Sequence, residues 1–321
     1  MKVAVIGAGN MGKHHARVYS EIKDCQFVGI VDANESVGKE VASKYGCQFF
    51  KSIEDLLKKI KPDAVSVCVP TSIHHKISSQ LIKSGVNILI EKPITSTLEE
   101  GNELVSLAKK HNVKLMVGHV ERYNPAVRKL KEIVKSGELG EITSILARRV
   151  GLFPPQIKDM DVIIDLAVHD IDVISHLLEK QPTEMFSNSG KALGNRHDYA
   201  DIFLKYNGGI NGLIQVNWIT PVKIRILNVT GTKGYAELNY ITQELLIFES
   251  NYEKTYDEFG DFVIKFGKPG KREIRVEKDE PLKLELIHFL NCIKNNREPL
   301  TSGEESIKTL DIALRIIKAG K

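Results

Sequence analysis

Residues 2–12, KVAVIGAGNMG, indicate the fold of the first part of the chain. Its apolar beginning predicts a strand over Lys2–Ile6, and residues 14–21 beyond it have the pattern of a helix. Gly7, Gly9 and Gly12 between them follow the spacing G-x-G-x-x-G. The first glycine permits a tight turn, the second lets the backbone approach a pyrophosphate, and the third lets the helix pack closely on the strand. This stretch therefore predicts a dinucleotide-binding turn at a helix N-terminus.

An acidic residue at the end of the next predicted strand, Phe27–Val31, indicates which dinucleotide is bound. Asp32 lies about 20 residues after Gly12, where a carboxylate accepts hydrogen bonds from the ribose hydroxyls of NAD and repels the 2′-phosphate of NADP. No arginine follows it, because the next residues are Ala33 and Asn34. A glycine turn with an unrelated surface aspartate is the alternative. We expect NAD as the cofactor, bound by Gly7, Gly9, Asn10, Met11, Gly12, Asp32, Pro70, Thr71, His74, Glu91 and Lys92.

Strands alternate with helices through the first 120 residues, in units whose length is typical of a parallel, doubly wound sheet. Further strands are expected over residues 64–69, 87–90 and 115–118, and helices over residues 35–45, 53–60, 75–84 and 97–111. This organisation predicts an α/β fold that begins with a Rossmann domain over residues 1–120.

The pattern changes after residue 120. Long strands between residues 199 and 248, with turns at residues 207–209 and 231–234, join an alternating strand over residues 142–150. They predict a C-terminal α/β domain, residues 121–321, whose mostly antiparallel sheet is open on one face. Helices are expected over residues 165–178, 281–294 and 304–319, and the last should pack back toward the Rossmann domain. Residues 251–280 are charged and turn-rich, and are placed only loosely.

Composition excludes several classes of function. The 45 basic and 41 acidic residues give a net charge of +4, and this near balance argues against a nucleic-acid or membrane-surface binder. The four cysteines show neither C-x-x-C nor zinc spacing, which is typical of buried thiols in a reducing compartment. We see no signal peptide and no apolar run long enough to span a bilayer. A cytoplasmic protein is expected.

The sequence Glu91-Lys92-Pro93 follows a predicted strand, at the sheet edge where open α/β folds bind ligands. A lysine there can reach a bound nicotinamide and a substrate hydroxyl, and its charge would favour an alkoxide before hydride leaves. A salt bridge between surface residues is the alternative. Lys92 is therefore a candidate catalytic residue, and whether Pro93 is cis is left open.

Asp165 and His169 are four residues apart, which places both on one face of a helix. The apolar residues around them indicate a buried or cleft-lining segment. A histidine there can act as a general base near neutral pH, and the carboxylate can orient the substrate or the imidazole. A core histidine with an aspartate partner is one alternative, and a metal site is another. No third ligand has a convincing spacing, so no metal is expected.

Other positions are weaker candidates. Thr71 and His74 follow the third strand and are expected to border the nicotinamide. Arg122, Tyr123 and Asn124 begin the second domain, and one of Arg148 and Arg149 could meet an anionic substrate group. Ordinary packing or solvated charge is the alternative for each. The residues expected to bind substrate are Arg122, Tyr123, Asn124, Arg149 and Asp165.

With these motifs in their order and separation, the chain resembles the Gfo/Idh/MocA oxidoreductase family over essentially its whole length. The resemblance rests on Gly7-x-Gly9-x-x-Gly12, Asp32, Glu91-Lys92-Pro93 and Asp165-x-x-x-His169. It implies that Lys92, Asp165 and His169 line the substrate site, and that the open sheet forms a dimer interface in many members. Leu166-Ala167-Val168 replaces a glycine-containing spacer found in many members, which affects the angle of His169.

Three further segments resemble a subgroup of this family, the UDP-N-acetylglucosamine 3-dehydrogenases. They are Gly118–Pro125, Phe153–Pro155 and Asn217–Pro221. The resemblance implies oxidation of the sugar C3 hydroxyl with NAD, for later amination by an aminotransferase. An NAD-dependent dehydrogenase of a free polyol such as inositol is the alternative, and a non-catalytic NAD-binding regulator is a third possibility. Oxidation at C6 is disfavoured, since no cysteine lies beside either catalytic motif.

An uncovered sheet face also predicts self-association, because apolar side chains there must be hidden from water. The candidate residues are Ile202, Leu204, Leu213, Ile214, Val216, Ile226 and Val229. We expect a homodimer or homotetramer, with a nucleotide sugar as substrate and neither nucleic acid nor membrane as a partner.

Overall fold

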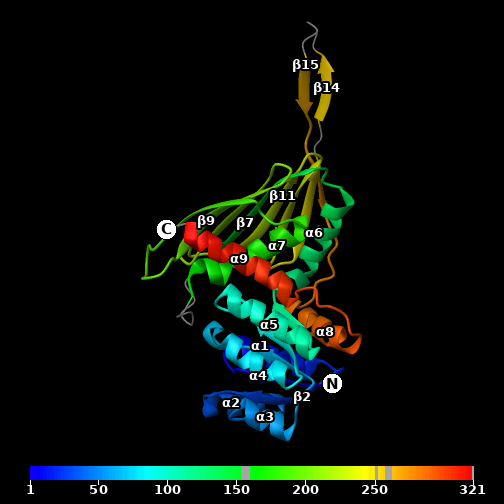
Figure 1. Cartoon of the computed structure of the whole chain (residues 1–321). Helices are drawn as coiled ribbons and strands as arrows, with labels where there is room; N and C mark the ends of the chain where they lie inside the picture. Colours follow the sequence, from blue (N-terminus) through cyan, green and yellow to red (C-terminus); the bar gives the residue numbers. More distant parts are fainter. Residues whose placement is uncertain (153–159, 250–251, 257–261, 320–321) are drawn as a thin grey trace. The chain divides into compact units, whose positions relative to one another are not determined.

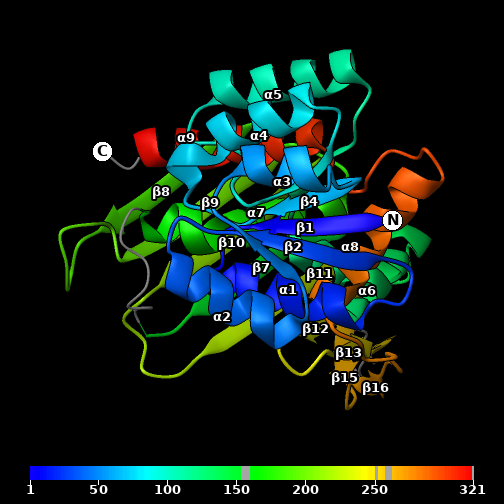
Figure 2. The same ribbon diagram turned by 90° about the horizontal axis from the view of Figure 1, so that it is seen from below.

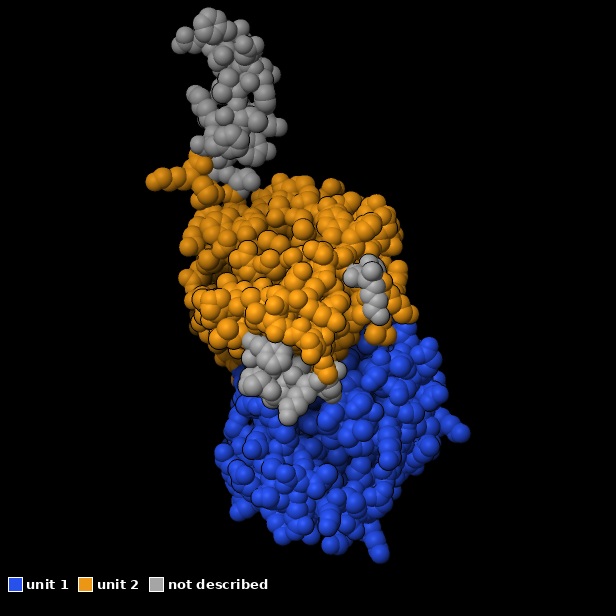
Figure 3. Space-filling model, turned by 90° about the vertical axis from the view of Figure 1, so that its left-hand side faces the viewer, with its two compact units in different colours: residues 1–123, 280–311 blue, residues 124–279, 312–321 orange. Residues whose placement is uncertain are grey.

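The computed structural model describes residues 1–152, 160–249, 252–256 and 262–319 (Figure 1). They form two compact units, coloured separately in Figure 3. Unit 1 comprises residues 1–123 and 280–311, and unit 2 comprises residues 124–279 and 312–321. The sequence prediction placed residues 280–311 in the second domain. They belong to unit 1 because the helix that begins at Pro281 supplies apolar side chains to its core.

Unit 1 is built on six short strands, with helices between them. The strands are β1 (Lys2–Ile6), β2 (Gln26–Val31), β3 (Gln48–Phe50), β4 (Ala64–Val67), β5 (Asn87–Glu91) and β6 (Leu115–Gly118). The helices are α1 (Asn10–Glu21), α2 (Glu35–Tyr45), α3 (Ile53–Lys59), α4 (His74–Lys83), α5 (Leu98–His111), α8 (Pro281–Lys294) and the first part of α9 (Gly303–Ala319). Two 3-10 turns complete the unit, η1 (Thr71–Ile73) and η2 (Val120–Tyr123).

The six strands form one parallel sheet in the order β3-β2-β1-β4-β5-β6. Figure 2 shows α1 and α2 on one face and α4 and α5 on the other. This is the doubly wound Rossmann arrangement, and it confirms the predicted fold class. Strand β3 was not predicted, because three residues are too few to show a period.

Local sequence signals fix where the helices begin and end. The Asn34 side chain caps α2 through the Val37 N–H, Ser52 caps α3 through Asp55, and Thr97 caps α5 through Glu100. Helix α2 ends at Gly46, which adopts the left-handed conformation that glycine tolerates best. These caps explain why the sequence boundaries of these helices lie within a residue of the observed ones.

The core of unit 1 depends on both parts of its chain. Apolar residues of β1, α1 and β2 pack with residues of α8, all of them buried: Leu282, Leu286, Phe289 and Leu290. Helix α9 contributes residues up to Asp311 to this unit. Its beginning is held there by His119, whose Nε2 lies 2.9 Å from Ser306 Oγ.

Unit 2 carries the other strands of the described residues. These are β7 (Ile142–Val150), β8 (Glu184–Gly190), β9 (Tyr199–Tyr206), β10 (Ile210–Asn217), β11 (Ile224–Gly231), β12 (Gly234–Asn239), β13 (Glu244–Glu249), β14 (Tyr252–Tyr256), β15 (Phe262–Phe266) and β16 (Gly270–Glu273). Its helices are α6 (Pro125–Ser136), a π-helical segment η3 (Ile163–Ala167) and α7 (Val168–Leu178). Helix α6 and strand β8 were not predicted.

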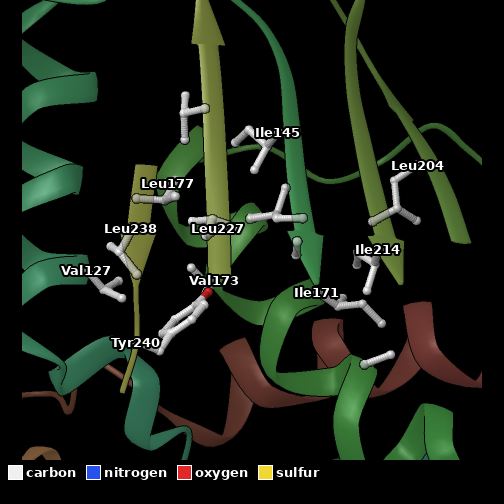
Figure 4. Close-up of a cluster of buried hydrophobic side chains, with 14 of the residues drawn as sticks. Val127, Ile145, Ile171, Val173, Leu177, Leu204, Ile214, Leu227, Leu238 and Tyr240 are labelled. Atoms are coloured by element: carbon white, nitrogen blue, oxygen red, sulfur yellow. The ribbon is translucent and has the colours of Figure 1, made fainter. Parts of the chain in front are cut away.

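Eight of these strands form a sheet in the order β16-β13-β12-β11-β7-β10-β9-β8. Only β7 and β10 pair in parallel; the other neighbours are antiparallel, which confirms the predicted sheet type. Strands β14 and β15 pair separately. Helix α6 packs on β12 and β13, and α7 packs on β7 and β10. Figure 4 shows part of the resulting core, in which Ile171, Val173 and Leu177 of α7 meet side chains of the strands.

The opposite face of this sheet exposes apolar side chains in register. Phe186 pairs with Phe203, Phe203 with Leu213, and Leu213 with Leu146, so the four form a continuous row across β8, β9, β10 and β7. Phe186, Leu213 and Leu146 are 59%, 40% and 41% exposed. Of the predicted interface residues, Leu213 lies in this row and Ile226 is partly exposed. The others point into the core, namely Ile202, Leu204, Ile214, Val216 and Val229.

The helices of the described ranges are either too short or too polar to cross a bilayer.

Candidate functional site

The glycine turn of unit 1 has the geometry that its sequence predicts. Gly7 has a φ of 96°, and a Cβ atom at this position would collide with the carbonyl group of Cys68. A Cβ on Gly12 would collide with the carbonyl of Gly7, whereas one on Gly9 would meet no atom within 4 Å. Helix α1 begins directly afterwards at Asn10. The turn therefore leaves the Gly9 backbone open beside the N–H groups of the first helical turn, which include Asn10 and Met11.

Asp32 ties the glycine turn to the end of β2. Its Oδ2 accepts from the Ala8 N–H at 2.6 Å and its Oδ1 accepts from the Asn34 N–H at 2.7 Å. A pocket of about 530 Å³ opens beside it, and Gly7, Gly9, Asp32 and Pro70 all line this pocket. The carboxylate thus stands at the place predicted for ribose recognition.

Other residues that line this pocket were not predicted from the sequence. They are Lys51, Ser52, Ile53 and Glu54 around the start of α3, Ile73 just before α4, and Lys76, Ile77 and Gln80 within α4. The capping residue Ser52 marks the start of α3, but no local motif indicates that these residues line the same pocket as the glycine turn.

The position of Asp32 gives a cofactor prediction. The unmodified protein should bind NAD more tightly than NADP, because a 2′-phosphate would meet the carboxylate at short range. Asp32→Ala should narrow that preference and also weaken NAD binding, since the Ala8 N–H loses its acceptor. Titration of both dinucleotides measures this, with Asp55→Ala, an exposed acid outside the pocket lining, as the control. Tighter binding of NADP by the unmodified protein would contradict the prediction.

Glu91 closes strand β5 as a buried carboxylate. His15 of α1 meets it, with Nε2 2.9 Å from Glu91 Oε1, and Gly118 leaves room for the carboxylate because a Cβ there would lie only 3.3 Å away. Burial raises the pKa of Glu91, but the hydrogen bond and charge of His15, with Lys92 and His74, bring it below its ordinary value. Glu91 is therefore an internal anchor beside Lys92, and the peptide bond from Lys92 to Pro93 is cis.

His74, predicted to border the nicotinamide, is instead 1% exposed. Its Nδ1 lies 2.9 Å from the Pro93 carbonyl oxygen and its Nε2 lies 2.9 Å from the Val69 carbonyl oxygen. Burial lowers the pKa of His74, opposed by these carbonyls and by the charge of Glu91. The ring therefore joins two loops of unit 1. Thr71, three residues earlier in the chain, begins η1 and is partly exposed.

Unit 2 carries the other two predicted catalytic residues. Asp165 lies in the π-helical segment η3 and His169 in the first turn of α7, so the single α-helix predicted over residues 165–178 begins with a π segment. Asp161 caps it, since its Oδ1 accepts from the N–H groups of Ile163 at 3.0 Å and Ile164 at 3.2 Å. Both candidate side chains are partly exposed. π segments occur often at functional sites, and this one sets the relation of Asp165 to His169.

Arg149, a predicted substrate residue, has a buried partner instead. Its Nε donates to Asp170 Oδ2 at 2.8 Å and its Nη2 donates to Asp170 Oδ1 at 3.0 Å. The guanidinium also lies 4.7 Å from the centre of the Tyr240 ring, and the Tyr240 hydroxyl donates to the same carboxylate. Because Nε and Nη2 of Arg149 both donate to Asp170, the geometry favours a structural role for this arginine beside His169.

Arg122, Tyr123 and Asn124 are likewise buried with protein partners. Arg122 donates to the Leu300 carbonyl, and the Tyr123 hydroxyl lies 3.2 Å from Thr301 Oγ1. Asn124 caps α6 and donates to the Tyr240 carbonyl at 3.1 Å. These contacts favour structural roles over the predicted contact with substrate.

The other segments that indicated the subgroup are less informative. In Asn217–Pro221 the Asn217 side chain accepts from the N–H groups of Ile219 and Thr220, and Trp218 is buried. Phe153–Pro155 lies outside the described residues.

A Rossmann unit whose glycine turn is backed by an acidic residue belongs to the dinucleotide-binding class of oxidoreductases. The model of an oxidoreductase family with an NAD-binding Rossmann fold matches residues 1–119, and that of the Gfo/Idh/MocA C-terminal domain matches residues 127–237. The chain therefore belongs to the Gfo/Idh/MocA family. It is an NAD-dependent oxidoreductase that acts on a CH–OH group.

Similar proteins extend over nearly the whole chain. It is 29% identical to UDP-N-acetylglucosamine 3-dehydrogenase from Acidithiobacillus ferrooxidans, over 98% of this chain and 96% of that protein. It is 25% identical to scyllo-inositol 2-dehydrogenase (NAD(+)) from Bacillus subtilis, over 98% of this chain and 92% of that protein. The solved structure of the Acidithiobacillus enzyme has a TM-score of 0.87 at 28% identity, covering 99% of this chain and 97% of that chain.

Proposed function

We propose that the protein oxidises the C3 hydroxyl of UDP-N-acetylglucosamine to a ketone and passes a hydride to NAD. The observation that carries the proposal is the likeness of the whole chain, in sequence and fold, to an enzyme with this activity. The oxidation balances as loss of a hydride from C3 to the nicotinamide and of a proton from the hydroxyl to a protein base. NADH and a 3-keto sugar nucleotide are the products.

The proposed roles follow the chemistry of the side chains. His169 removes the hydroxyl proton, because a neutral imidazole is a good base near pH 7. Lys92 stabilises the developing alkoxide by its charge. Asp165 holds a sugar hydroxyl or orients the imidazole of His169. Bound NAD supplies the hydride acceptor, held at the Gly7–Gly12 turn and by Asp32.

The remote part of the substrate would supply binding energy that positions C3 for hydride transfer. Cationic residues of unit 2 are the candidates for holding the pyrophosphate. Arg149 is engaged with Asp170, and Arg225 donates to the Val150 and Ile224 carbonyls. The exposed Arg148 and Lys223 are therefore the stronger candidates.

A free polyol is the second candidate substrate. The full-length likeness to scyllo-inositol 2-dehydrogenase favours it, at a somewhat lower identity. A non-catalytic NAD-binding regulator is the third possibility, and the presence of both Lys92 and His169 argues against it.

A substrate panel tests these alternatives. The protein is incubated with NAD and UDP-N-acetylglucosamine, its uronic acid, UDP-glucose or myo-inositol, with and without an aminotransferase that traps 3-keto sugar nucleotides. We expect NADH only with UDP-N-acetylglucosamine, and more of it when the aminotransferase, its proposed pathway partner, is present. NADH formation with inositol alone would reject the sugar nucleotide and leave the dehydrogenase activity standing.

We further propose that the row of Phe186, Phe203, Leu213 and Leu146 forms an interface in a homodimer or homotetramer. Exposed apolar side chains in one row lose contact with water when two such faces pack. Leu213→Glu should lower the mass measured by light scattering to that of a smaller species. Val222→Glu, a similar change at a residue that is 62% exposed outside the sheet, should not. A monomeric unmodified protein at micromolar concentration would reject this proposal.

A further inference from the structure

We propose that His74 is a positioning residue for Lys92, acting through the carbonyl group of Pro93. The inference rests on the proposed function in one respect, since it takes Lys92 to be catalytic. His74 is then a buried residue that holds the backbone next to Lys92, in place of the contact with the cofactor that the sequence indicated.

The contacts of His74 span two neighbouring strands. Strands β4 and β5 pair in parallel, with Val67 opposite Ile90, so their carboxyl ends lie at one edge of the sheet. Val69 follows β4 and Pro93 follows β5. The imidazole of His74, at the first residue of α4, lies 2.9 Å from the carbonyl oxygen of each. One buried ring thus links the two chain segments that leave this edge.

Lys92 lies between two such anchors. On its N-terminal side Glu91 is held by His15 from α1, and on its C-terminal side Pro93 is held by His74 from α4. Pro93 has no N–H group, so its carbonyl is the only main-chain hydrogen-bonding group through which this residue can be held. A neutral imidazole has a single N–H, and burial lowers the pKa of His74, so the ring donates to only one of the two carbonyls at a time. We take Nδ1–H to be the donor to the Pro93 carbonyl, with Nε2 packed against the Val69 carbonyl.

The functional consequence follows from the length of the lysine side chain. A flexible four-carbon stem places its ammonium group reproducibly only if its backbone is fixed. A displacement of about 1 Å at a reacting group can cost up to about 100-fold in rate. Loss of the Pro93 contact should therefore reduce turnover while the binding of NAD, which takes place at the glycine turn, is unaffected.

Two substitutions separate the two contacts of the ring. In His74→Asn the amide nitrogen takes the place of Nδ1 and can still donate to Pro93. In His74→Gln it takes the place of Nε2 and can reach only Val69. We expect kcat to fall about tenfold to 100-fold in His74→Gln and less than about threefold in His74→Asn, with KM nearly unchanged in both. The NAD Kd should be nearly unchanged in His74→Gln, which keeps the contact with Val69 of the pocket lining. The same two changes at His75, whose side chain is 30% exposed and pairs with Glu103, are the controls and should leave kcat unchanged.

A double-variant cycle decides whether His74 acts through Lys92. In a Lys92→Met background the His74→Gln change should cost less than about twofold. An equal loss in both backgrounds, or equal kcat in His74→Asn and His74→Gln, would overturn the proposal. If His74→Gln does not fold, His74→Ala takes its place in the cycle, since it lacks both contacts.

The assays use whichever sugar of the panel yields NADH. Failure of the proposed function gives results that differ from failure of the His74 proposal. They are full turnover by the Lys92→Met single variant, or no turnover of UDP-N-acetylglucosamine by the unmodified protein.

Discussion

Replacing Lys92 by methionine is expected to lower turnover by about two to four orders of magnitude, the range for a lost acid–base or charge-stabilising group. Methionine keeps the apolar stem of the lysine but removes its charge, so the alkoxide would form without a nearby cation. Steady-state NADH formation measures the loss. NAD titration should give a Kd close to that of the unmodified protein.

The same range is expected for His169→Asn, because the amide cannot accept a proton near neutral pH. Matched controls are Lys83→Met, at an exposed end of α4, and His176→Asn, in a later turn of α7. Both controls should keep full turnover. If Lys92→Met or His169→Asn keeps close to full activity, that residue is structural and its proposed role is wrong.

The largest effect on stability is expected at the buried pair of Arg149 and Asp170. Asp170→Ala leaves a guanidinium without its carboxylate in the core of unit 2, at a cost of about 3–5 kcal/mol. In a unit of this size about 1 kcal/mol corresponds to about 2–4 °C in melting temperature. Thermal unfolding followed by circular dichroism should therefore show a fall of roughly 6–20 °C.

Two further variants test the cause of that fall. Replacing both partners, Arg149→Leu with Asp170→Leu, should restore much of the stability, because no buried charge is then left unpaired. Lys205→Ala breaks an ion pair with Glu184 whose two side chains are about half exposed, and should cost only about 0–1 kcal/mol. A small effect of Asp170→Ala would mean that Arg149 finds another partner or water, and would free it for the substrate role first predicted.

Most of unit 1 could be predicted because each of its elements carries its own signal. Apolar runs mark the strands, and the capping residues Asn34, Ser52 and Thr97 mark helix starts. The glycine turn and Asp32 were recognised for the same reason: their meaning depends on a short spacing and on the order of strand and helix. The turns at residues 207–209 and 231–234 located the antiparallel strands in the same way.

The contacts that could not be predicted join residues far apart in the chain. The His15 ring contacts the Glu91 carboxylate, and Arg122 donates to the Leu300 carbonyl. No local sequence pattern predicts either contact. The partner of Arg149 could not be predicted, because a buried arginine and a substrate-binding arginine look alike until that partner, here Asp170, is known. The π segment at Asp165 was also not predicted, because its apolar pattern is that of an ordinary α-helix.

The division of the two cores along the chain has a consequence for synthesis on the ribosome. The core of unit 1 needs Leu286 and Phe289, and that of unit 2 needs Ile312 and Ile316, so both wait for the last tenth or so of the polypeptide. At about 5–20 residues per second, translation leaves the Rossmann strands without α8 for tens of seconds after they emerge. The N-terminal portion, although made first, thus cannot finish folding until α8 has been made. A nascent chain of this kind is a natural client for chaperones that shield apolar strands.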